Sequence, residues 1–424
     1  MSIMSGENIQ QVLLEMGKRA RRAAAALAIL PDEAKRSCLN AMADALNANA
    51  ALIMEYNARD LAKARSNNLA SAMIDRLTLN EKRINAMADG LRTVAKQHDP
   101  VGRVLNKTIR DNGLEITKIS VPFGVIGIIY EARPNVTSDA SGICIKAGNA
   151  VILRGGSEAF ESNTIIAKIM NEAAVSCGLP AGTVQLLPWT DREAVKLMLK
   201  MDKYIDLVIP RGGEGLIRTV TAEATMPVLK HYKGVCHLYV DAKCDFETAV
   251  KIVVNAKCQR PGVCNALETL LIAEDALPVF APMLVKAMTE NQVELRSDEK
   301  FAAFCPAAKA ATEDDWYAEY LSLTLAVKTV SGVEEAIGHI NTYGSKHSDG
   351  ILSTDAENIA LFTANVDSST VYVNASTRFT DGGEFGMGAE IGISTDKLHA
   401  RGPMGADELT SYKYIVRGNG QIRS

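Results

Sequence analysis

The chain has 424 residues, of which 47% are hydrophobic and 23% are charged, and its formal net charge at pH 7 is −4. These values are ordinary for a soluble globular protein, and the length favours two large lobes over a single core. The acidic balance argues against a nucleic-acid-binding protein, which would carry a basic surface. The longest apolar runs, near residues 23–30 and 121–130, fall short of the ~20 residues that a membrane helix needs. We therefore expect neither nucleic acid nor a membrane among the partners.

The number and spacing of the cysteines indicate the cellular compartment in which the protein works. There are eight of them, and no two have the CxxC spacing. A chain of this length does not need disulfide bonds to hold its core together. We expect reduced thiols in a cytoplasmic protein, most of them buried and one or two of them chemically special. The eight are Cys38, Cys144, Cys177, Cys236, Cys244, Cys258, Cys264 and Cys305.

Helix-forming residues dominate the first hundred positions. Segments 6–30 and 33–64 are rich in Ala, Leu, Met, Lys and Glu and are predicted as helices. Thr78 and Glu81 have the spacing of a capping box, which predicts a helix from there through Ala95.

A hairpin follows the helices. Residues 104–120 alternate around Asn112-Gly113, a pair typical of a tight turn between two strands. Residues 412–415 predict one more strand near the end of the chain. Together these segments predict a small third sheet, of the kind that often mediates self-association.

From residue 121 onward, short apolar runs alternate with helical segments such as 158–176 and 191–201. This alternation predicts right-handed βαβ units and parallel sheets buried on both faces. The predicted strands are 125–130, 150–154, 184–187, 205–209, 237–240, 267–273, 323–328 and 370–373.

Two strand ends carry the same pattern of an arginine, two glycines and a following helix. One is Arg154-Gly155-Gly156-Ser157 and the other is Arg211-Gly212-Gly213. Glycine lets a ligand approach the backbone, and the free N–H groups of a helix start favour anions. Because ligands of parallel sheets bind at the carboxyl ends of strands, the two loops fit a phosphate-bearing nucleotide. An ordinary strand-to-helix turn without a ligand is an equally good interpretation, and no G-x-G-x-x-G follows the first strand.

A cysteine lies in a Pro-Gly turn, Pro261-Gly262-Val263-Cys264-Asn265-Ala266, between a predicted helix and the strand 267–273. N–H groups of such a turn can hold a tetrahedral oxyanion about 3 Å away. Cys264 is therefore the candidate nucleophile, with an inert core cysteine as the alternative. Cys258 is predicted inside the helix and is expected to be inert.

Asn135 follows the strand 125–130 and stands at the start of the next predicted helix. One interpretation is a helix N-cap. The other is catalytic, because its side-chain amide could donate to the same oxyanion as the backbone N–H of Cys264.

At these residues, and nearly from end to end, the chain resembles the aldehyde dehydrogenase superfamily, and within it the glutamyl phosphate reductase branch. Segment 261–266 is similar to the superfamily's nucleophilic cysteine motif, which implies that role for Cys264. Asn135 falls at the superfamily's oxyanion asparagine. Segment 146–158 resembles the one that leads into the adenosine-ribose site, and Glu319 falls at a glutamate that binds the nicotinamide ribose.

Two further segments carry the resemblance. Residues 381–392 resemble a glycine-rich loop near the end of the catalytic lobe, and 333–351 are similar to a signature peculiar to the branch. The implied fold is α/β and aldehyde-dehydrogenase-like, with two parallel-sheet lobes and a small bridging sheet. The implied division is a cofactor-binding domain at 1–103 and 121–233, a catalytic domain at 234–400, and a bridging and oligomerisation element at 104–120 and 401–424.

One departure from the superfamily bears on the chemistry. Hydrolytic members carry a glutamate and two glycines at the segment equivalent to 228–234, and that glutamate activates water against the thioester. Here the segment is Val228-Leu229-Lys230-His231-Tyr232-Lys233-Gly234, without a carboxylate. Without a placed base, attack of water on the thioester is slow. Phosphate is the acyl acceptor that the branch implies, and His231 as a base is the less favoured alternative to a structural histidine.

The resemblance implies an NADPH-dependent reduction of L-glutamyl 5-phosphate to L-glutamate 5-semialdehyde and phosphate, through a Cys264 thioester, in proline biosynthesis. NADPH or NADP⁺ is the expected cofactor, with the two Arg-Gly-Gly loops and Glu319 as its contacts, and no metal is expected. The alternatives are another non-hydrolytic acyl reductase that uses coenzyme A, and a catalytically silent member of the superfamily.

The expected partners are the small-molecule substrate, the upstream glutamate kinase and further copies of the chain in a homo-oligomer. The anionic groups of the substrate need cationic partners, because an arginine fork suits carboxylate and phosphate. The candidates are Arg133, Arg378, Arg401 and His347, each of which could instead serve a structural ion pair.

Overall fold

The computed structural model describes residues 6–423, apart from the side chains of residues 7, 8 and 72. The chain divides into two compact units, Met1–Lys230 with Gly386–Gly392 and Met404–Ser424, and His231–Phe385 with Ile393–Pro403. Residues 386–392, which the sequence placed within 234–400, thus group with the first unit. Among the described residues, no helix is both long and apolar enough to cross a membrane.

Helices open the first unit, as the composition predicts. They are α1 (Gly6–Leu27), α2 (Asp32–Ala48), α3 (Ala50–Ser66), α4 (Ser71–Leu77) and α5 (Glu81–Lys96). The predicted helix 33–64 is two helices, because the backbone leaves the helical region at Asn49 (φ −104°, ψ 17°). The capping box was wrong: the side chain of Asn80 caps α5 by accepting from the N–H of Arg83 at 2.9 Å. The hydroxyl of Thr78 instead donates back into the end of α4.

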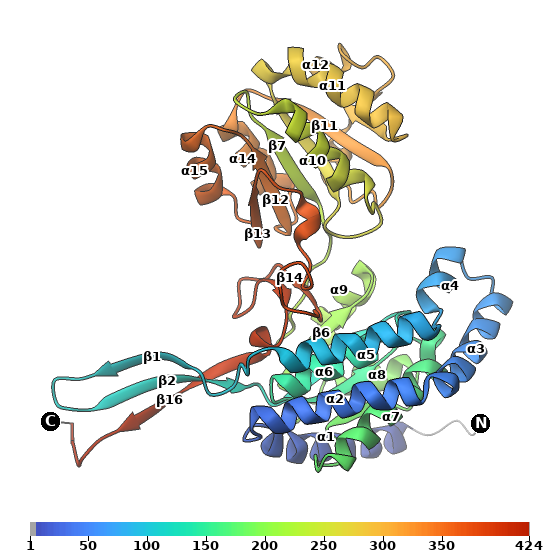
Figure 1. Cartoon of the computed structure of the whole chain (residues 1–424), viewed down its shortest axis with the longest axis vertical. Helices are drawn as coiled ribbons and strands as arrows, with labels where there is room; N and C mark the ends of the chain where they lie inside the picture. Colours follow the sequence, from blue (N-terminus) through green and yellow to red (C-terminus); the bar gives the residue numbers. More distant parts are fainter. Residues whose placement is uncertain (1–5, 424) are drawn as a thin grey trace. The chain divides into compact units, whose positions relative to one another are not determined.

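A four-stranded parallel sheet forms the centre of the first unit (Figure 1). Its order is β5-β4-β3-β6, with β3 (Val125–Tyr130), β4 (Ala150–Arg154), β5 (Val184–Leu186) and β6 (Leu207–Arg211). The connecting helices are α6 (Asn135–Lys146), α7 (Phe160–Ser176), α8 (Arg192–Met198) and α9 (Glu214–Glu223). The predicted βαβ alternation is confirmed, and β3 is buried along its whole length because it is an inner strand covered on both faces.

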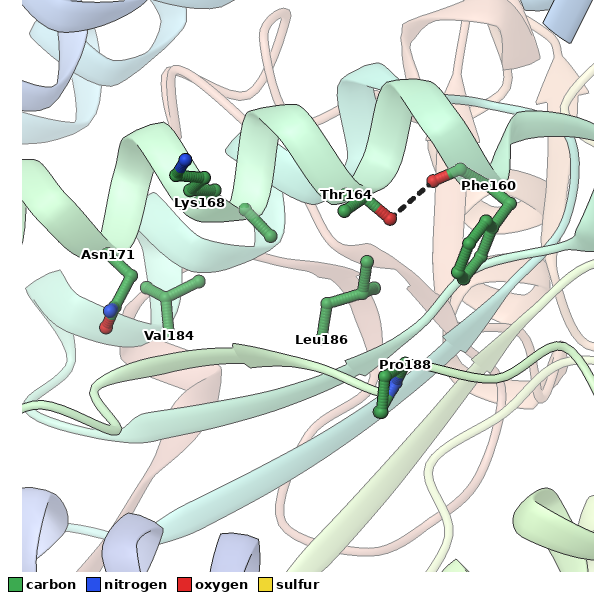
Figure 2. Close-up of a pocket in the computed structure, with 8 residues that line it drawn as sticks. Phe160, Thr164, Lys168, Asn171, Val184, Leu186 and Pro188 are labelled. Carbon is green, nitrogen blue, oxygen red and sulfur yellow. Dashed lines mark hydrogen bonds between the residues drawn. The ribbon is translucent and has the colours of Figure 1, made fainter. Parts of the chain in front are cut away.

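A pocket of about 250 Å³ lies between α7 and β5. Figure 2 shows the hydroxyl of Thr164 turned toward the carbonyl oxygen of Phe160, to which it donates at 2.7 Å. The pocket is lined by Phe160, Thr164, Ala167, Lys168, Asn171, Val184, Leu186 and Pro188. None of the residues that the sequence predicts to bind a ligand is among them.

The second unit is built on a seven-stranded parallel sheet in the order β10-β9-β11-β8-β7-β12-β13. Its strands are β7 (Cys236–Val240), β8 (Leu267–Ala273), β9 (Glu294–Ser297), β10 (Lys309–Ala310), β11 (Thr324–Val330), β12 (Ser348–Leu352) and β13 (Thr370–Val373). Its helices are α10 (Phe246–Cys258), α11 (Leu277–Glu290), α12 (Glu299–Ala302), α13 (Glu313–Trp316), α14 (Val333–Tyr343) and α15 (Ala356–Asn365). The predicted strands at β7, β8, β11 and β13 are confirmed, whereas β9, β10 and β12 were not predicted.

The third sheet is antiparallel and contains β1 (Val104–Ile109), β2 (Glu115–Pro122) and β16 (Thr410–Arg417). The predicted Asn112-Gly113 turn joins β1 to β2, and Gly113 adopts φ +83°, which a side chain would disfavour. The terminal strand pairs with β2 along its whole length, so the predicted small sheet is confirmed. A further short pair is formed by β14 (Gly392–Ser394) and β15 (Gly402–Met404).

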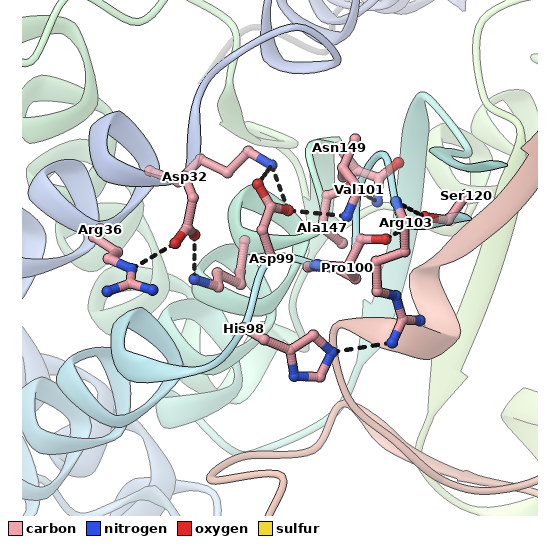
Figure 3. Close-up of polar contacts among 12 residues, drawn as sticks. Asp32, Arg36, His98, Asp99, Pro100, Val101, Arg103, Ser120, Ala147 and Asn149 are labelled. Atoms are coloured by element: carbon pink, nitrogen blue, oxygen red, sulfur yellow. Dashed lines mark hydrogen bonds and ion pairs between the residues drawn. The ribbon is translucent and has the colours of Figure 1, made fainter. Parts of the chain in front are cut away.

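Two buried lysines tie segments of the first unit together through Asp32 and Asp99, whose polar contacts are drawn in Figure 3. The ammonium of Lys146, at the end of α6, is fully buried and lies 2.6 Å from a carboxylate oxygen of Asp32 at the start of α2. Asp32 also holds Arg36 at 2.6 Å. Lys35 is equally buried and lies 2.9 Å from Asp99, which leads into the hairpin. Lys146 therefore serves packing, although its segment resembles the approach to a ribose site.

These contacts predict an asymmetric effect of mutation. Asp32→Ala leaves the buried ammonium of Lys146 with only the carbonyl of Ala95, at 3.2 Å, and should lower the free energy of unfolding by about 3 kcal/mol. Lys146→Met should cost less than half of that, because its stem still packs and Asp32 keeps Arg36. Urea denaturation checks both. The control Asp44→Ala removes an exposed partner of Arg92 and should change little; equal losses in Asp32→Ala and Asp44→Ala would contradict the prediction.

Candidate active site

The turn that carries Cys264 lies between α10 and β8, as predicted. Cys264 is half-buried, and the N–H of Ala266 donates to the carbonyl of Val263 at 3.0 Å to close the turn. Cys258 ends α10, so its predicted place inside the helix is confirmed. All eight cysteines are free thiols. Unlike Cys258, Cys264 stands on non-helical backbone.

The neighbouring Asn265 anchors the turn to the segment 377–380. Its amide donates to the carbonyl of Thr380 at 2.9 Å, and its own carbonyl accepts from the hydroxyl of Thr377 at 2.8 Å. The guanidinium of Arg378 donates to the side-chain oxygen of Asn265 and, at 2.8 Å, to that of Gln259. Arg378, a candidate substrate ligand, thus binds both ends of the turn 259–266, which is called the nucleophile turn after its candidate nucleophile Cys264.

Gly234 packs against the backbone of Cys264. A Cβ atom at position 234 would overlap the carbonyl group of Cys264, so only glycine fits. The N–H of Gly234 donates to the carboxylate of the half-buried Glu319 at 2.8 Å. The thiol of Cys236 donates to the same Cys264 carbonyl at 3.2 Å. The structure therefore brings the predicted Glu319 and Cys264 together through a glycine that the sequence did not single out.

Two imidazoles lie beside the sulfur. One ring nitrogen of His231, one of His347 and the Sγ of Cys264 are all within 4.8 Å of one another. The rings of His231 and His347 meet edge to face, with centroids 5.6 Å apart. The Nδ1 of His231 donates to the carbonyl of Ile393 at 2.8 Å, which leaves Nε2 of that ring as the acceptor. His231 thus lies beside Cys264 and also makes a hydrogen bond of the kind expected for a structural histidine, which was the favoured prediction.

A buried ion pair underlies the turn and was missed in the sequence. Lys257 and Glu268 are both fully buried, 2.6 Å apart, and Lys257 also donates to the carbonyl of Leu267 at 2.8 Å. The other carboxylate oxygen of Glu268 accepts from the N–H of Leu321 at 3.2 Å. Burial raises the pKa of Glu268 and lowers that of Lys257. The pair ties α10 and β8, which flank Cys264, to the segment that carries Glu319.

The first Arg-Gly-Gly loop lies at the carboxyl end of β4. The main chain of Arg154 stands opposite Ile129 of β3, and its guanidinium donates to the carbonyl of Thr190 at 2.7 Å. Three buried polar atoms at this strand end have no hydrogen-bond partner: Nε of Arg154, Oε2 of Glu158 and Nδ2 of Asn163. Because buried polar atoms are normally satisfied, these three are candidates for contacts with a polar ligand. Ser157 is exposed at the start of the short helix Ser157–Ala159.

The second loop, at the carboxyl end of β6, differs from the first. Arg211 stands opposite Tyr130 of β3 and pairs with Glu390 at 3.6 Å. The N–H of Gly213 donates to the carboxylate of Glu131 at 3.0 Å. A protein carboxylate therefore already occupies the start of α9, where an anionic ligand was expected. The side chain of Glu131 also packs against Gly212, where a Cβ atom would clash with it.

Asn135 is the first residue of α6, and the N-cap position before it is Pro134, which makes no side-chain cap. The N-cap interpretation of Asn135 was therefore wrong. Its amide instead donates to the carboxylate of Asp139 at 2.9 Å, and burial raises the pKa of Asp139 to about 6. Arg133 is half-buried and precedes α6 by two residues. Of the other candidates, Arg401 is held by Asp367 at 3.0 Å.

The contact at Gly234 generates a test. Gly234→Ala should displace the main chain of Cys264 and slow its alkylation by iodoacetamide at least tenfold, an order of magnitude typical of misplacing a reacting group. Mass spectrometry of the labelled peptide measures the rate. Gly338→Ala is the matched control, because a Cβ at that position in α14 meets open space. Equal alkylation of the two variants would show that position 234 does not hold the turn.

Comparison with known proteins agrees with this arrangement. The model of the aldehyde dehydrogenase family matches residues 10–320. A gamma-glutamyl phosphate reductase of Geobacter metallireducens is 56% identical and covers 95% of this chain and 97% of its own; one of Moorella thermoacetica is 54% identical and covers 98% and 100%. The crystal structure of the Thermotoga maritima gamma-glutamyl phosphate reductase superposes with a TM-score of 0.95, at 45% identity, over 97% of this chain and 100% of that one. The chain therefore belongs to the aldehyde dehydrogenase family, and within it to the gamma-glutamyl phosphate reductases.

Proposed function

We propose that this chain reduces L-glutamyl 5-phosphate to L-glutamate 5-semialdehyde with release of phosphate, in proline biosynthesis, through a thioester on Cys264. Identity of 45–56% to gamma-glutamyl phosphate reductases over nearly the whole chain supports the reaction. The observation that carries the mechanism is the half-buried Cys264 thiol on an anchored turn, with two imidazoles within 4.8 Å.

The first step uses groups of the second unit. Only the thiolate is a strong nucleophile, so a base must take the proton of Cys264. Nε2 of His231 can accept it, because Nδ1 of the same ring is committed to the carbonyl of Ile393. The sulfur then attacks the acyl carbon, the carbon–oxygen bond to phosphate breaks, and phosphate leaves with its electron pair. A thioester on Cys264 remains.

Asn135 is proposed as the side-chain donor to the oxyanion of this step, together with a backbone N–H of the turn. The hydrogen bond to Asp139 supports this role. The carboxylate accepts one hydrogen of the Asn135 amide at 2.9 Å and so orients the second hydrogen of the same amide. A preorganised donor of this kind stabilises the charge that develops on the carbonyl oxygen. Arg133 and His347 are proposed to bind the substrate's anionic groups, and Arg378 to support them from the turn.

The family uses nicotinamide cofactors, and we propose NADPH for this chain. When bound, the cofactor supplies the hydride that reduces the thioester. The groups proposed to hold it are Arg154, Gly155, Gly156, Ser157, Arg211, Gly212, Gly213 and Glu319. The best-supported contact is at the end of β4, where the unpartnered atoms of Arg154, Glu158 and Asn163 can form hydrogen bonds with the hydroxyl and phosphate groups of the cofactor. The positive charge of Arg154 favours the additional phosphate of NADPH over NADH.

The cellular location, the oligomeric state and the protein partner are also proposed. Free thiols throughout support a cytoplasmic location. The third sheet exposes apolar side chains on two of its strands, which supports a homo-oligomer built through it. These side chains are Val104, Leu105, Ile109, Tyr412, Tyr414 and Val416. The upstream glutamate kinase is the proposed partner that delivers the unstable acyl phosphate.

The reverse reaction tests the proposal. The purified protein should reduce NADP⁺ with pyrroline-5-carboxylate only when inorganic phosphate is present. The segment 228–234 has no carboxylate to activate water, so the thioester needs phosphate as its acceptor. Cys264→Ala should abolish turnover with the fold intact by circular dichroism, whereas Cys258→Ala should keep it. Equal rates without phosphate would overturn the acyl-phosphate chemistry and favour hydrolysis with His231 as the base. Dependence on coenzyme A would favour the other acyl reductases.

A second test separates catalysis from structure at Asn135. Asn135→Ala should lower kcat roughly 10²- to 10³-fold if the amide is an oxyanion donor. Asp139→Asn keeps the amide while it removes the charged anchor, so its kcat should fall less. Thermal melting of both variants should stay close to the parent protein. A loss of kcat below tenfold in Asn135→Ala would assign the amide to the Asp139 contact alone.

A further inference from the structure

Three side chains from distant parts of the sequence converge beside the nucleophile turn. His231 comes from the segment before β7, Cys264 from the turn itself, and His347 from the residue before β12. One ligand atom of each lies within 4.8 Å of those of the other two. His231 and Cys264 are half-buried and His347 is buried, so the group is partly open to solvent.

This set of donors has the chemistry of a zinc site. Thiolate and imidazole are the ligands that Zn²⁺ prefers, in tetrahedral geometry. Bonds of about 2.0–2.3 Å place neighbouring ligands about 3.3–3.6 Å apart, so the three atoms need to close by little more than about 1 Å. Side-chain rotation supplies a movement of that size. Three protein ligands leave the fourth position to water or to a substrate oxygen.

We propose that His231, Cys264 and His347 bind one Zn²⁺ ion reversibly and that the ion caps the Cys264 sulfur. On binding, the thiol gives up its proton to solvent and the thiolate donates its electron pair to the metal. The binding site stands on the three side chains alone. Its consequence, inhibition of the reductase, rests on the proposed function of Cys264.

The residues around the trio are arranged as they are around known metal ligands. A metal-bound histidine normally uses its other nitrogen for a hydrogen bond that fixes the ring. Nδ1 of His231 donates to the Ile393 carbonyl at 2.8 Å, which turns Nε2 into the ligand atom. Nδ1 of His347 is hydrogen-bonded to the hydroxyl of Ser348 at 2.8 Å. That hydroxyl is itself bonded to Thr380 at 2.6 Å, so the ring is held from behind.

Cobalt and zinc titrations of the full-length protein test the site. Co²⁺ bound to the parent protein should give the absorption of a tetrahedral thiolate complex, at one ion per chain, and Zn²⁺ should displace it. The thiolate band should vanish in Cys264→Ser. His231→Asn should weaken zinc binding by more than about a hundredfold, because losing a ligand costs more than losing a contact behind one. His347→Asn should act alike, and Cys177→Ser, which removes an exposed thiol elsewhere, should change nothing.

The parent protein alone gives a further readout, which is needed because the buried His347 is a demanding position to change. One equivalent of Zn²⁺ should protect Cys264 from iodoacetamide but leave Cys177 reactive, and a chelator should restore labelling. Unchanged zinc affinity in His231→Asn, or no protection of Cys264, would overturn the site whatever the enzyme activity. Zinc protection together with full activity in Cys264→Ala would instead overturn the proposed function and leave the site standing.

Discussion

The backbone contact between Gly234 and Cys264 is the constraint on which the rest of the second unit's site depends. The segment that leads into β7 runs directly against the nucleophile turn, which is possible because position 234 is a glycine and has no side chain. The N–H of Gly234 then fixes Glu319, and His231 stands three residues before it. The close approach of these two main-chain segments thus sets the positions of Glu319, His231 and the Cys264 sulfur relative to one another.

The buried ion pair of Lys257 and Glu268 near this contact connects segments that an apolar pair would not connect. Burying Lys257 and Glu268 carries a desolvation cost, and hydrophobic residues of similar size would often be at least as stable. The carboxylate, however, has a second oxygen, and it accepts from the N–H of Leu321. Because one group satisfies partners on two segments, the pair fixes how the Glu319 segment lies against α10 and β8. We infer that its value is positional rather than a gain in stability.

The fold was largely predictable where burial shows directly in the sequence. β3 is a continuous apolar run, β4 is apolar up to Arg154, and the Asn112-Gly113 pair marks the turn of the hairpin. β12 escaped prediction because it is fully buried yet contains Asp349, whose carboxylate is satisfied by His237, 112 residues away. β9 was missed because it carries the charged residues Glu294 and Arg296, which pair with Lys309 and Asp315 farther along the chain. In both cases the compensating partner is set by tertiary structure, which a local pattern does not record.

The residues of the candidate site also divide into those that a local motif shows and those that only the tertiary structure brings together. Cys264, Asn135 and Glu319 stand in local motifs, so a sequence can nominate them as candidates, whereas the meeting of His231 and His347 depends on how distant segments pack. That meeting gives the sulfur two competing partners. An imidazole lone pair that accepts the thiol proton is the same lone pair that binds a cation, and the thiolate formed by losing that proton is the better metal ligand. The features proposed to activate Cys264 are therefore the same ones proposed to make it a ligand for soft cations. Acylation of the sulfur would remove its negative charge and its ability to bind a metal in one step.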